Sequence, residues 1–151
     1  MISVNVFSEE RAWSKRLKNK DLFFKNVCNA LPRKYKFSNK KVSLSLLLSN
    51  NKNIKKLNKV FRKKNKATDV LSFPFYKREE LKKIIRLNKN IYLGDIILNH
   101  YKIKNSSKEN FKKDFDRLWV HGLLHLIGYR HSQNKDFNKM NKLETNILTK
   151  F

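Results

Sequence analysis

Cysteine, proline and glycine are all scarce in this chain of 151 residues, which contains 1 cysteine, 2 prolines and 3 glycines. The single Cys28 cannot form a disulfide within the chain, so a small disulfide-stapled secreted domain is excluded. No apolar run approaches the roughly 20 residues that span a membrane, and residues 1–10 lack the basic and apolar regions of a secretion signal. We therefore expect a cytoplasmic protein with no membrane partner.

Acidic residues are also few, and the charge balance is the most unusual feature of the composition. The chain has 12 aspartates and glutamates against 36 lysines and arginines, which leaves a formal net charge of +24. Self-repulsion of this size disfavours a compact state unless a partner screens it, so a polyanion such as nucleic acid is the first expectation. The alternative is a drift of the whole composition toward lysine and asparagine, with no ligand behind it.

The length and the hydrophobic content of 40% predict a single domain, residues 1–151, with one core. Four segments have the alternation or the apolar content of strands, at residues 2–7, 41–48, 68–74 and 91–98. Pro74 lacks a backbone N–H group, which suits an edge strand. The sequence therefore predicts an α+β fold in which helices pack on a mixed four-stranded sheet.

Helices are predicted between these strands and after them. The first should span residues 13–30 and end before Pro32, and the second should begin at Asn50 or Asn51 and end near Arg62. A short helix is possible at residues 79–87, within a lysine-rich surface segment. A long buried helix should begin at Ser106 or Ser107 and continue to residue 126, and a last helix should span residues 136–148.

One segment of this long helix holds three of the four histidines of the chain, in the order His121-Gly-Leu-Leu-His125-Leu-Ile-Gly-Tyr-Arg-His131. On a helix, His121 and His125 are four residues apart and point from the same face. Gly128 follows where a helix commonly ends on a left-handed glycine, and the returning chain can bring His131 to the same point. The spacing therefore predicts three imidazoles that converge on one metal ion.

Three histidines leave the fourth tetrahedral position of a zinc ion open, which is typical of catalytic sites. We therefore expect one zinc ion per chain, bound by His121, His125 and His131, that lowers the pKa of a bound water to about 7. The alternative is that these are packing histidines on an apolar helix. The spacing is that of the metzincin proteases, but Gly122 stands where those enzymes have the glutamate that serves as general base.

The histidine segment resembles the signature H-G-x-L-H-L-x-G-Y-D-H of the bacterial YbeY family, and departs from it at Arg130, where the family usually has aspartate. Two further blocks are similar to that family. The first comprises Leu57 to Arg62 followed by Thr68 to Pro74, and the second is Leu93 to Ile96. The resemblance extends over nearly the whole chain.

This resemblance implies a single-strand-specific, zinc-dependent endoribonuclease that acts in rRNA maturation, at the 3′ end of 16S rRNA, and in late-stage ribosome quality control. The implied partners are rRNA and the small ribosomal subunit, with a ribosomal protein and an Era-type GTPase as further ones, and DNA is not expected. The resemblance assigns Arg62 to the reacting phosphate, beside His121 as the second catalytic residue. Without it, Arg62 would be a surface cation that closes a helix C-terminus.

Two other functions share parts of this pattern. A metallopeptidase would have the same ligands but lacks its usual base here, and a non-catalytic ribosome-assembly factor would use the charge for RNA and the metal for structure. If an RNA 2′-hydroxyl is the nucleophile, a general base is needed, and no residue in the sequence identifies it. Outside the motif, we expect Asp95 to cap or brace a turn, with a role at the metal as the alternative. We expect His100 to bind no metal and Met140 to pack in the core.

Overall fold

Strands and helices alternate along the chain. The computed structural model describes residues 2–17, 29, 31, 37, 39–103 and 107–150. The elements are β1 (Ile2–Ser8), α1 (Arg11–Arg16), β2 (Lys41–Ser49), α3 (Asn51–Arg62), β3 (Val70–Pro74), α4 (Arg78–Leu87), β4 (Asn90–Asn99), η2 (His100–Lys102), α5 (Lys108–Leu126) and α6 (Asn134–Leu148). All four predicted strands are present, and α4 confirms the possible short helix.

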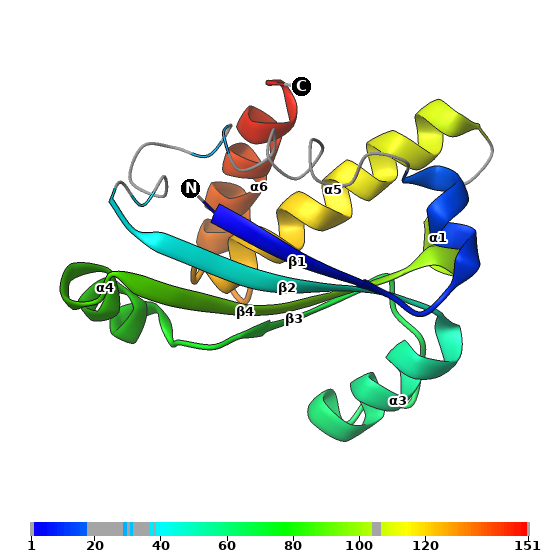
Figure 1. Cartoon of the computed structure of the whole chain (residues 1–151), viewed down its shortest axis with the longest axis horizontal. Coiled ribbons are helices and arrows are strands. Elements are labelled where there is room, and N and C mark those ends of the chain that lie inside the picture. The colour runs from blue at the N-terminus through cyan, green and yellow to red at the C-terminus, as the bar shows by residue number, and fades with distance from the viewer. Residues whose placement is uncertain are drawn as a thin grey trace.

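The strands form one mixed sheet in the order β1-β2-β4-β3 (Figure 1). β1 pairs in parallel with β2 and β2 with β4, whereas β3 runs antiparallel to β4. β3 is therefore an edge strand, as Pro74 predicted, and Pro74 lies opposite Gly94 at its end. The α+β class with a mixed four-stranded sheet is confirmed.

Both faces of the sheet are covered, but unequally. On one face, side chains of β2 and β4 pack on α5 in the main core, whose members include Leu44, Leu46, Leu48, Leu93, Ile96, Leu98, Phe115, Leu118, Trp119 and Leu123. On the other face, a smaller cluster joins Leu71 and Ile97 to Ile54 of α3. Figure 1 shows α5 and α6 on one side of the sheet and α3 on the other. The histidine helix is thus the central buried element of the fold.

The first helix is much shorter than predicted, and that prediction was wrong. α1 ends at Arg16 because Leu17 has left the helical conformation, with φ −116° and ψ 80°. Trp13 is buried, as expected of a core residue, and its indole N–H donates to the carbonyl of Ser49 at 3.1 Å. This long-range bond holds α1 at the end of β2, which the apolar periodicity could not reveal. Residues 18–28, 30 and 32 of the predicted helix and its stop lie outside the described residues.

Side-chain caps begin the two helices that carry candidate site residues. Asn50 accepts a hydrogen bond from the N–H of Asn53 at 2.9 Å, and Ser107 accepts one from the N–H of Asn110 at 3.1 Å. Such caps satisfy N–H groups that the first turn of a helix leaves free. Both predicted starts are therefore confirmed, and the alternative at Ser106 lies outside the described residues.

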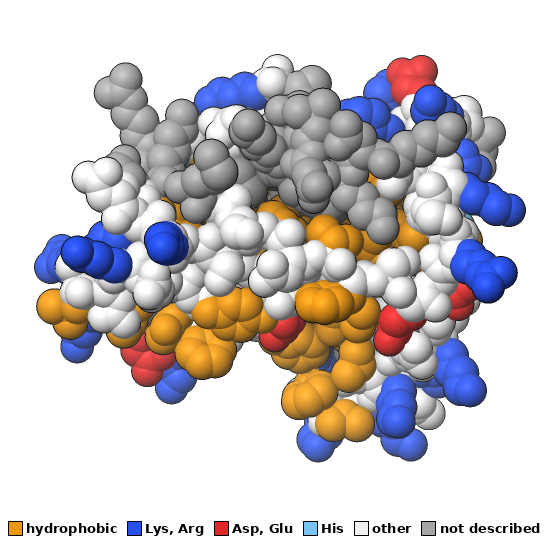
Figure 2. All heavy atoms as spheres, viewed as in Figure 1, with side chains coloured by type: hydrophobic (Ala, Val, Ile, Leu, Met, Phe, Trp, Pro, Cys, Tyr) orange, Lys and Arg blue, Asp and Glu red, His pale blue; other side chains and the backbone are white. Residues whose placement is uncertain are grey.

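Lysine and arginine side chains are spread widely over the surface, with few acidic ones among them (Figure 2). Figure 2 shows hydrophobic side chains gathered on the side of the sheet that carries α3. Phe61 and Phe75 are each 63% exposed. None of the helices that the structure describes is long and apolar enough to cross a membrane.

Candidate metal centre

α5 carries two of the three predicted metal ligands on one face. His121 and His125 are separated by one turn, and both are partly buried, with 25% of the His121 side chain exposed. The residues around them, from Leu118 to Leu126, are almost all buried against the sheet and α6. Because packing fixes the helix on most sides, both imidazoles are held on a rigid support.

The turn after α5 is a Schellman motif, and it brings the third histidine back toward the helix. The N–H of Gly128 donates to the carbonyl of His125 at 3.0 Å. The N–H of Tyr129 donates to the carbonyl of Leu124 at 3.0 Å, which completes the motif. Gly128 has φ +95°, so the predicted left-handed glycine is confirmed, and a Cβ there would lie 2.9 Å from Cγ of Arg78. The turn therefore needs glycine for its conformation and for its packing.

The three histidines converge. One ring nitrogen from each of His121, His125 and His131 lies within 4.8 Å of the other two. The Nε2 atoms of His121 and His125 are 3.0 Å apart, near the separation of about 3.3 Å that two imidazoles have around a tetrahedral ion with bonds of about 2.0–2.1 Å. The donor set and its spacing therefore fit a single transition-metal ion.

The outer nitrogens of the two helical histidines already have partners. Nδ1 of His121 lies 3.1 Å from Oε2 of Glu144, and Nδ1 of His125 lies 2.8 Å from the carbonyl of Tyr129. An acceptor at Nδ1 holds the proton there and leaves Nε2 free as a ligand, which is how metal-binding histidines are commonly oriented. The Schellman turn thus orients a histidine as well as ending the helix.

Glu144 is the site residue that the sequence did not reveal. It lies on α6, 23 residues after His121, and its side chain is 13% exposed. No spacing rule relates a carboxylate on one helix to a histidine on another, and α6 carries a second carboxylate, that of Asp136. Only the packing of α6 against α5 singles out Glu144.

Burial strongly affects the protonation of His125. The pKa of His125 is lowered from 6.5 to about 4: burial is the largest cause, the bond to Tyr129 opposes the shift, and the charges of His121, His131 and Arg62 add to it. The imidazole is therefore neutral at neutral pH. Neutral imidazole is the form that binds a metal ion.

Gly122 explains why the protease base is absent. This glycine faces the sheet at close range, and a Cβ there would be 2.8 Å from Cγ2 of Ile96 and 3.3 Å from Oγ of Ser72. A glutamate at this position would have to enter the core rather than reach the histidines. The close packing of α5 on β3 and β4 therefore excludes the usual metzincin base.

Arg62 approaches the histidines from the other side of the sheet. It is the last residue of α3, and its Nη2 donates to the carbonyl of Ser72 on the edge strand β3 at 3.4 Å. Its charge contributes to the lowered pKa of His125. The position is compatible with both predicted roles, since the guanidinium lies near the triad and also in the last turn of a helix.

A cleft between α5 and α6 leads to the triad. It has a volume of about 240 Å³, and its lining includes His121, His131 and Glu144 together with Arg117 and Phe137. Phe137 is 54% exposed, so an apolar ring lies at the surface beside two of the histidines. The cleft offers space, a cation and an exposed ring next to the candidate ligands.

Asp95 does not brace a turn, and that prediction was wrong. It lies inside β4, where its carboxylate accepts a hydrogen bond from the hydroxyl of Tyr92 at 2.6 Å. The preceding Gly94 has φ +128° because β4 changes register there, and a Cβ on it would lie 2.1 Å from the carbonyl oxygen of Phe73. The glycine and aspartate thus belong to an irregular strand, a context that resembles a turn in sequence.

His100 and Met140 both pack against other side chains. The ring of His100 packs 5.1 Å from Trp13 and 5.8 Å from Phe111, measured between centroids, and burial lowers its pKa. His100 is not a member of the group of ring nitrogens that converge. Met140 is buried in the main core, as expected.

Comparisons with known proteins agree with the sequence blocks. A family model described as Endoribonuclease YbeY matches residues 7–151. The chain belongs to the YbeY family. The endoribonuclease YbeY of Pelagibacter ubique is 49% identical over 154 residues, which cover 100% of this chain and 96% of that relative. The YbeY of Ehrlichia canis is 33% identical over 153 residues, covering 99% and 92%. The predicted family is confirmed. Its members are named endoribonucleases, which is the expected class of enzyme.

A solved structure supports the same fold. The solution structure of a protein from Thermotoga maritima matches with a TM-score of 0.55 over 97% of this chain and 90% of that chain. The two sequences are 24% identical. This likeness concerns the fold alone, and the YbeY assignment comes from the family model and the relatives.

Proposed function

We propose that the chain is a zinc-dependent endoribonuclease that cleaves single-stranded RNA, with one zinc ion held by His121, His125 and His131. The observation that carries this proposal is the convergence of three imidazoles, two of them with their outer nitrogens already bound, in a chain of the YbeY family. Zinc held by these residues would supply a Lewis acid that lowers the pKa of a water to about 7, so that hydrolysis would need no separate strong base.

The residues around the triad would each have a defined task. Arg62 stabilises the negative charge that grows on the phosphate oxygens, because its guanidinium is planar and always charged. Glu144 orients His121 and favours its ligand form. The net charge of +24 attracts the RNA strand and raises the rate of encounter.

We extend the proposal to the biological substrate through the family. The RNA would be rRNA, with processing at the 3′ end of 16S rRNA and a further part in late-stage ribosome quality control. The small ribosomal subunit would be the main partner, with a ribosomal protein and an Era-type GTPase as additional ones. A single domain, residues 1–151, would carry this function in the cytoplasm.

The test uses the purified full chain with single-stranded RNA, duplex RNA, single-stranded DNA and casein, each with and without a chelator. We expect about one zinc per chain by elemental analysis, and cleavage of single-stranded RNA alone that stops with chelator and returns with added zinc. A double variant, His121→Ala with His125→Ala, should contain no stoichiometric metal and should not cleave.

Other results would replace the proposal. Cleavage of casein would identify a metallopeptidase, and RNA binding with bound metal but no cleavage would identify an assembly factor. Metal near zero in the unmutated protein, or full metal in the double variant, would remove the site itself.

A further inference from the structure

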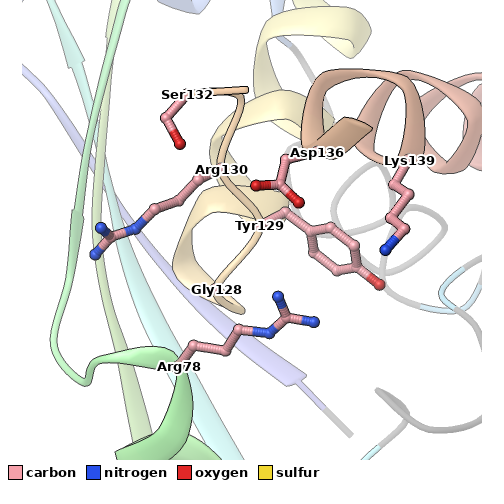
Figure 3. Close-up of a pocket in the computed structure, with 7 residues that line it drawn as sticks. All are labelled: Arg78, Gly128, Tyr129, Arg130, Ser132, Asp136 and Lys139. Atoms are coloured by element: carbon pink, nitrogen blue, oxygen red, sulfur yellow. The ribbon is translucent and has the colours of Figure 1, made fainter. Parts of the chain in front are cut away.

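A second pocket, which we call the basic pocket, lies beside the loop that carries His131. It has a volume of about 140 Å³ and is lined by the turn at Gly128 and Tyr129 and by the side chains of Arg78, Arg130, Ser132, Asp136 and Lys139. Figure 3 shows Arg78 below the turn, at the start of α4, and Lys139 on α6 on the other side of the Tyr129 ring. Two segments that are distant in sequence, the start of α4 and the stretch from the turn into α6, thus place three cations in the lining of one pocket.

Arg78 is held in this pocket by packing. Its Cβ and Cγ lie 3.0 and 2.9 Å from the position that a Cβ on Gly128 would occupy, so the stem rests on the glycine turn. Its guanidinium carbon lies 5.9 Å from the centre of the Tyr129 ring, within reach of a cation–π contact. Because the first contact uses the aliphatic stem and the second uses the face of the guanidinium, neither occupies the N–H groups of Arg78, which stay available to a ligand.

The cations of the basic pocket have no ion-pair partners in the part of the chain that the structure describes. The ion pairs there involve other lysines and arginines or His121, but not Arg78, Arg130 or Lys139. Asp136 is the one carboxylate of the lining, so three cations and one anion leave a local charge of 3 − 1 = +2. Neighbouring unpaired cations repel, and an anion between them would relieve this repulsion.

The basic pocket and the triad share one loop. The carbonyl of Tyr129 binds Nδ1 of His125, and Arg130 directly precedes His131. An anion bound in the basic pocket would therefore be separated from the histidines by this one loop. A volume of about 140 Å³ equals four or five waters at about 30 Å³ each, which is enough for a phosphate group, and the positive charge of the lining favours an anion.

We propose that the basic pocket is a subsite for a backbone phosphate of the RNA strand, adjacent to the phosphate that is cleaved at the triad. This inference rests on the proposed ribonuclease function and adds to it the part that sets the register of the strand. Arginine forks bind phosphate oxygens in pairs, so Arg78 would position the strand as well as attract it. Arg130 stands where the family pattern has aspartate, so this cation reinforces the subsite in this particular chain.

The first test uses the opposite charges in the lining. Arg78→Gln, Lys139→Gln and Arg130→Asp should each raise the enzyme concentration that gives half-maximal single-turnover cleavage, by about tenfold for Arg78, and should each lower the salt slope of binding by about 1. Asp136→Asn should act in the opposite direction and lower that concentration. If these residues only packed the lining, the cation variants and Asp136→Asn would both raise the enzyme concentration for half-maximal cleavage, because either change would disturb the same packing.

Two variants outside the pocket are matched controls. Arg86→Gln changes an exposed arginine further along α4, and Lys142→Gln changes an exposed lysine further along α6. Both remove one charge from the same helices, so they measure the effect of net charge alone. Thermal melting checks that each variant folds, and Arg130→Gln replaces Arg130→Asp if the latter does not.

The second test locates the phosphate. In a set of RNA oligonucleotides, a single uncharged methylphosphonate replaces each phosphate in turn near the cleavage site. One neighbouring position should weaken cleavage by the unmutated enzyme about tenfold but have little effect on Arg78→Gln. If the pocket variants match their controls, or no position shows this non-additivity, the subsite is wrong although the enzyme cleaves RNA. If the unmutated enzyme neither binds nor cleaves RNA, the proposed function fails and the subsite falls with it.

Discussion

The two halves of the histidine triad are held in different ways. His121 and His125 project from α5, whose flanking residues are buried, and both have a partner at Nδ1. His131 is exposed and follows a Schellman turn. The helical half is therefore arranged before any metal binds, whereas the loop half depends on one turn. This difference implies that α5 supplies the affinity of the site and the loop completes it.

The charges around the two halves differ as well. On the helical side, Arg62 reaches over the edge strand to the carbonyl of Ser72 and lies close enough to lower the pKa of His125. On the loop side, Arg78 and Arg130 line the basic pocket. A strand bound at the triad would thus meet one arginine from α3 and a cluster of cations beyond the loop.

The largest expected effect is a difference in metal binding between the variants His125→Ala and His131→Ala. His125→Ala removes a ligand from the rigid half, so metal should fall below stoichiometric detection and cleavage should be lost. His131→Ala should retain weakened zinc binding, because two preorganised nitrogens and water can still complete the coordination. Zinc affinity measured by competition with a chelator compares the two variants. Equal losses of zinc affinity in the two variants would show that the helical and loop halves do not differ in this way.

Arg62→Lys should have the next largest effect. If Arg62 stabilises charge on the reacting phosphate, the variant should keep its fold and metal but lose about 2 to 4 kcal/mol of transition-state stabilisation, or roughly 10²–10³ in rate. Lysine keeps the charge and loses the fork. Single-turnover cleavage at saturating enzyme measures this apart from binding.

Arg86→Lys is the matched control for Arg62→Lys, since Arg86 lies in the last turn of α4. If Arg62 only closes α3, both variants should lose at most a few tenths of a kcal/mol of stability and none of the cleavage rate. That outcome would leave the helical half without an electrostatic partner for the phosphate.

Glu144→Gln should weaken the helical half without dismantling it. The amide keeps the shape of the carboxylate but loses its charge, so His121 becomes a poorer ligand and metal affinity should fall about 10- to 100-fold. Chelator competition measures this fall, with Glu109→Gln as a control because Glu109 is an exposed carboxylate at the start of α5. Unchanged affinity would mean that packing alone orients His121.

The smallest effect concerns pH and the metal-free protein. Since the pKa of His125 falls from 6.5 to about 4 on folding, the unfolded state binds more protons between these values. His125 therefore adds stability that is fully present above about pH 6.5 and is lost as pH falls toward 4. Urea unfolding across this range should show a decline that is smaller in His125→Gln. Identical pH profiles would show that burial does not hold the helical half neutral.

Local features of the fold and site were predictable from the sequence. The caps at Asn50 and Ser107, the left-handed Gly128 and the edge position of Pro74 each follow from backbone chemistry within a few residues. The convergence of the histidines belongs with them, because helical geometry and one turn relate all three. These predictions succeeded since no distant contact was needed to make them.

Other features were missed or mistaken. α1 ends at Arg16 although the apolar pattern continues, and Asp95 bonds to Tyr92 within a strand instead of bracing a turn. Glu144 had no local pattern at all, because its partner His121 lies 23 residues away on another helix.

The sequence by itself determined the candidate ligand set of this protein, its family and its large positive charge, because residue type and spacing are enough for these. Only the tertiary structure decided what surrounds the ligands. Packing of α6 on α5 selects Glu144, and close contact of α5 with the sheet excludes a base at Gly122. The approach of α4 to the turn after α5 places Arg78 beside the histidine loop. These are relations between elements that no local rule connects, so the chain had to fold before the neighbours of its histidines were defined.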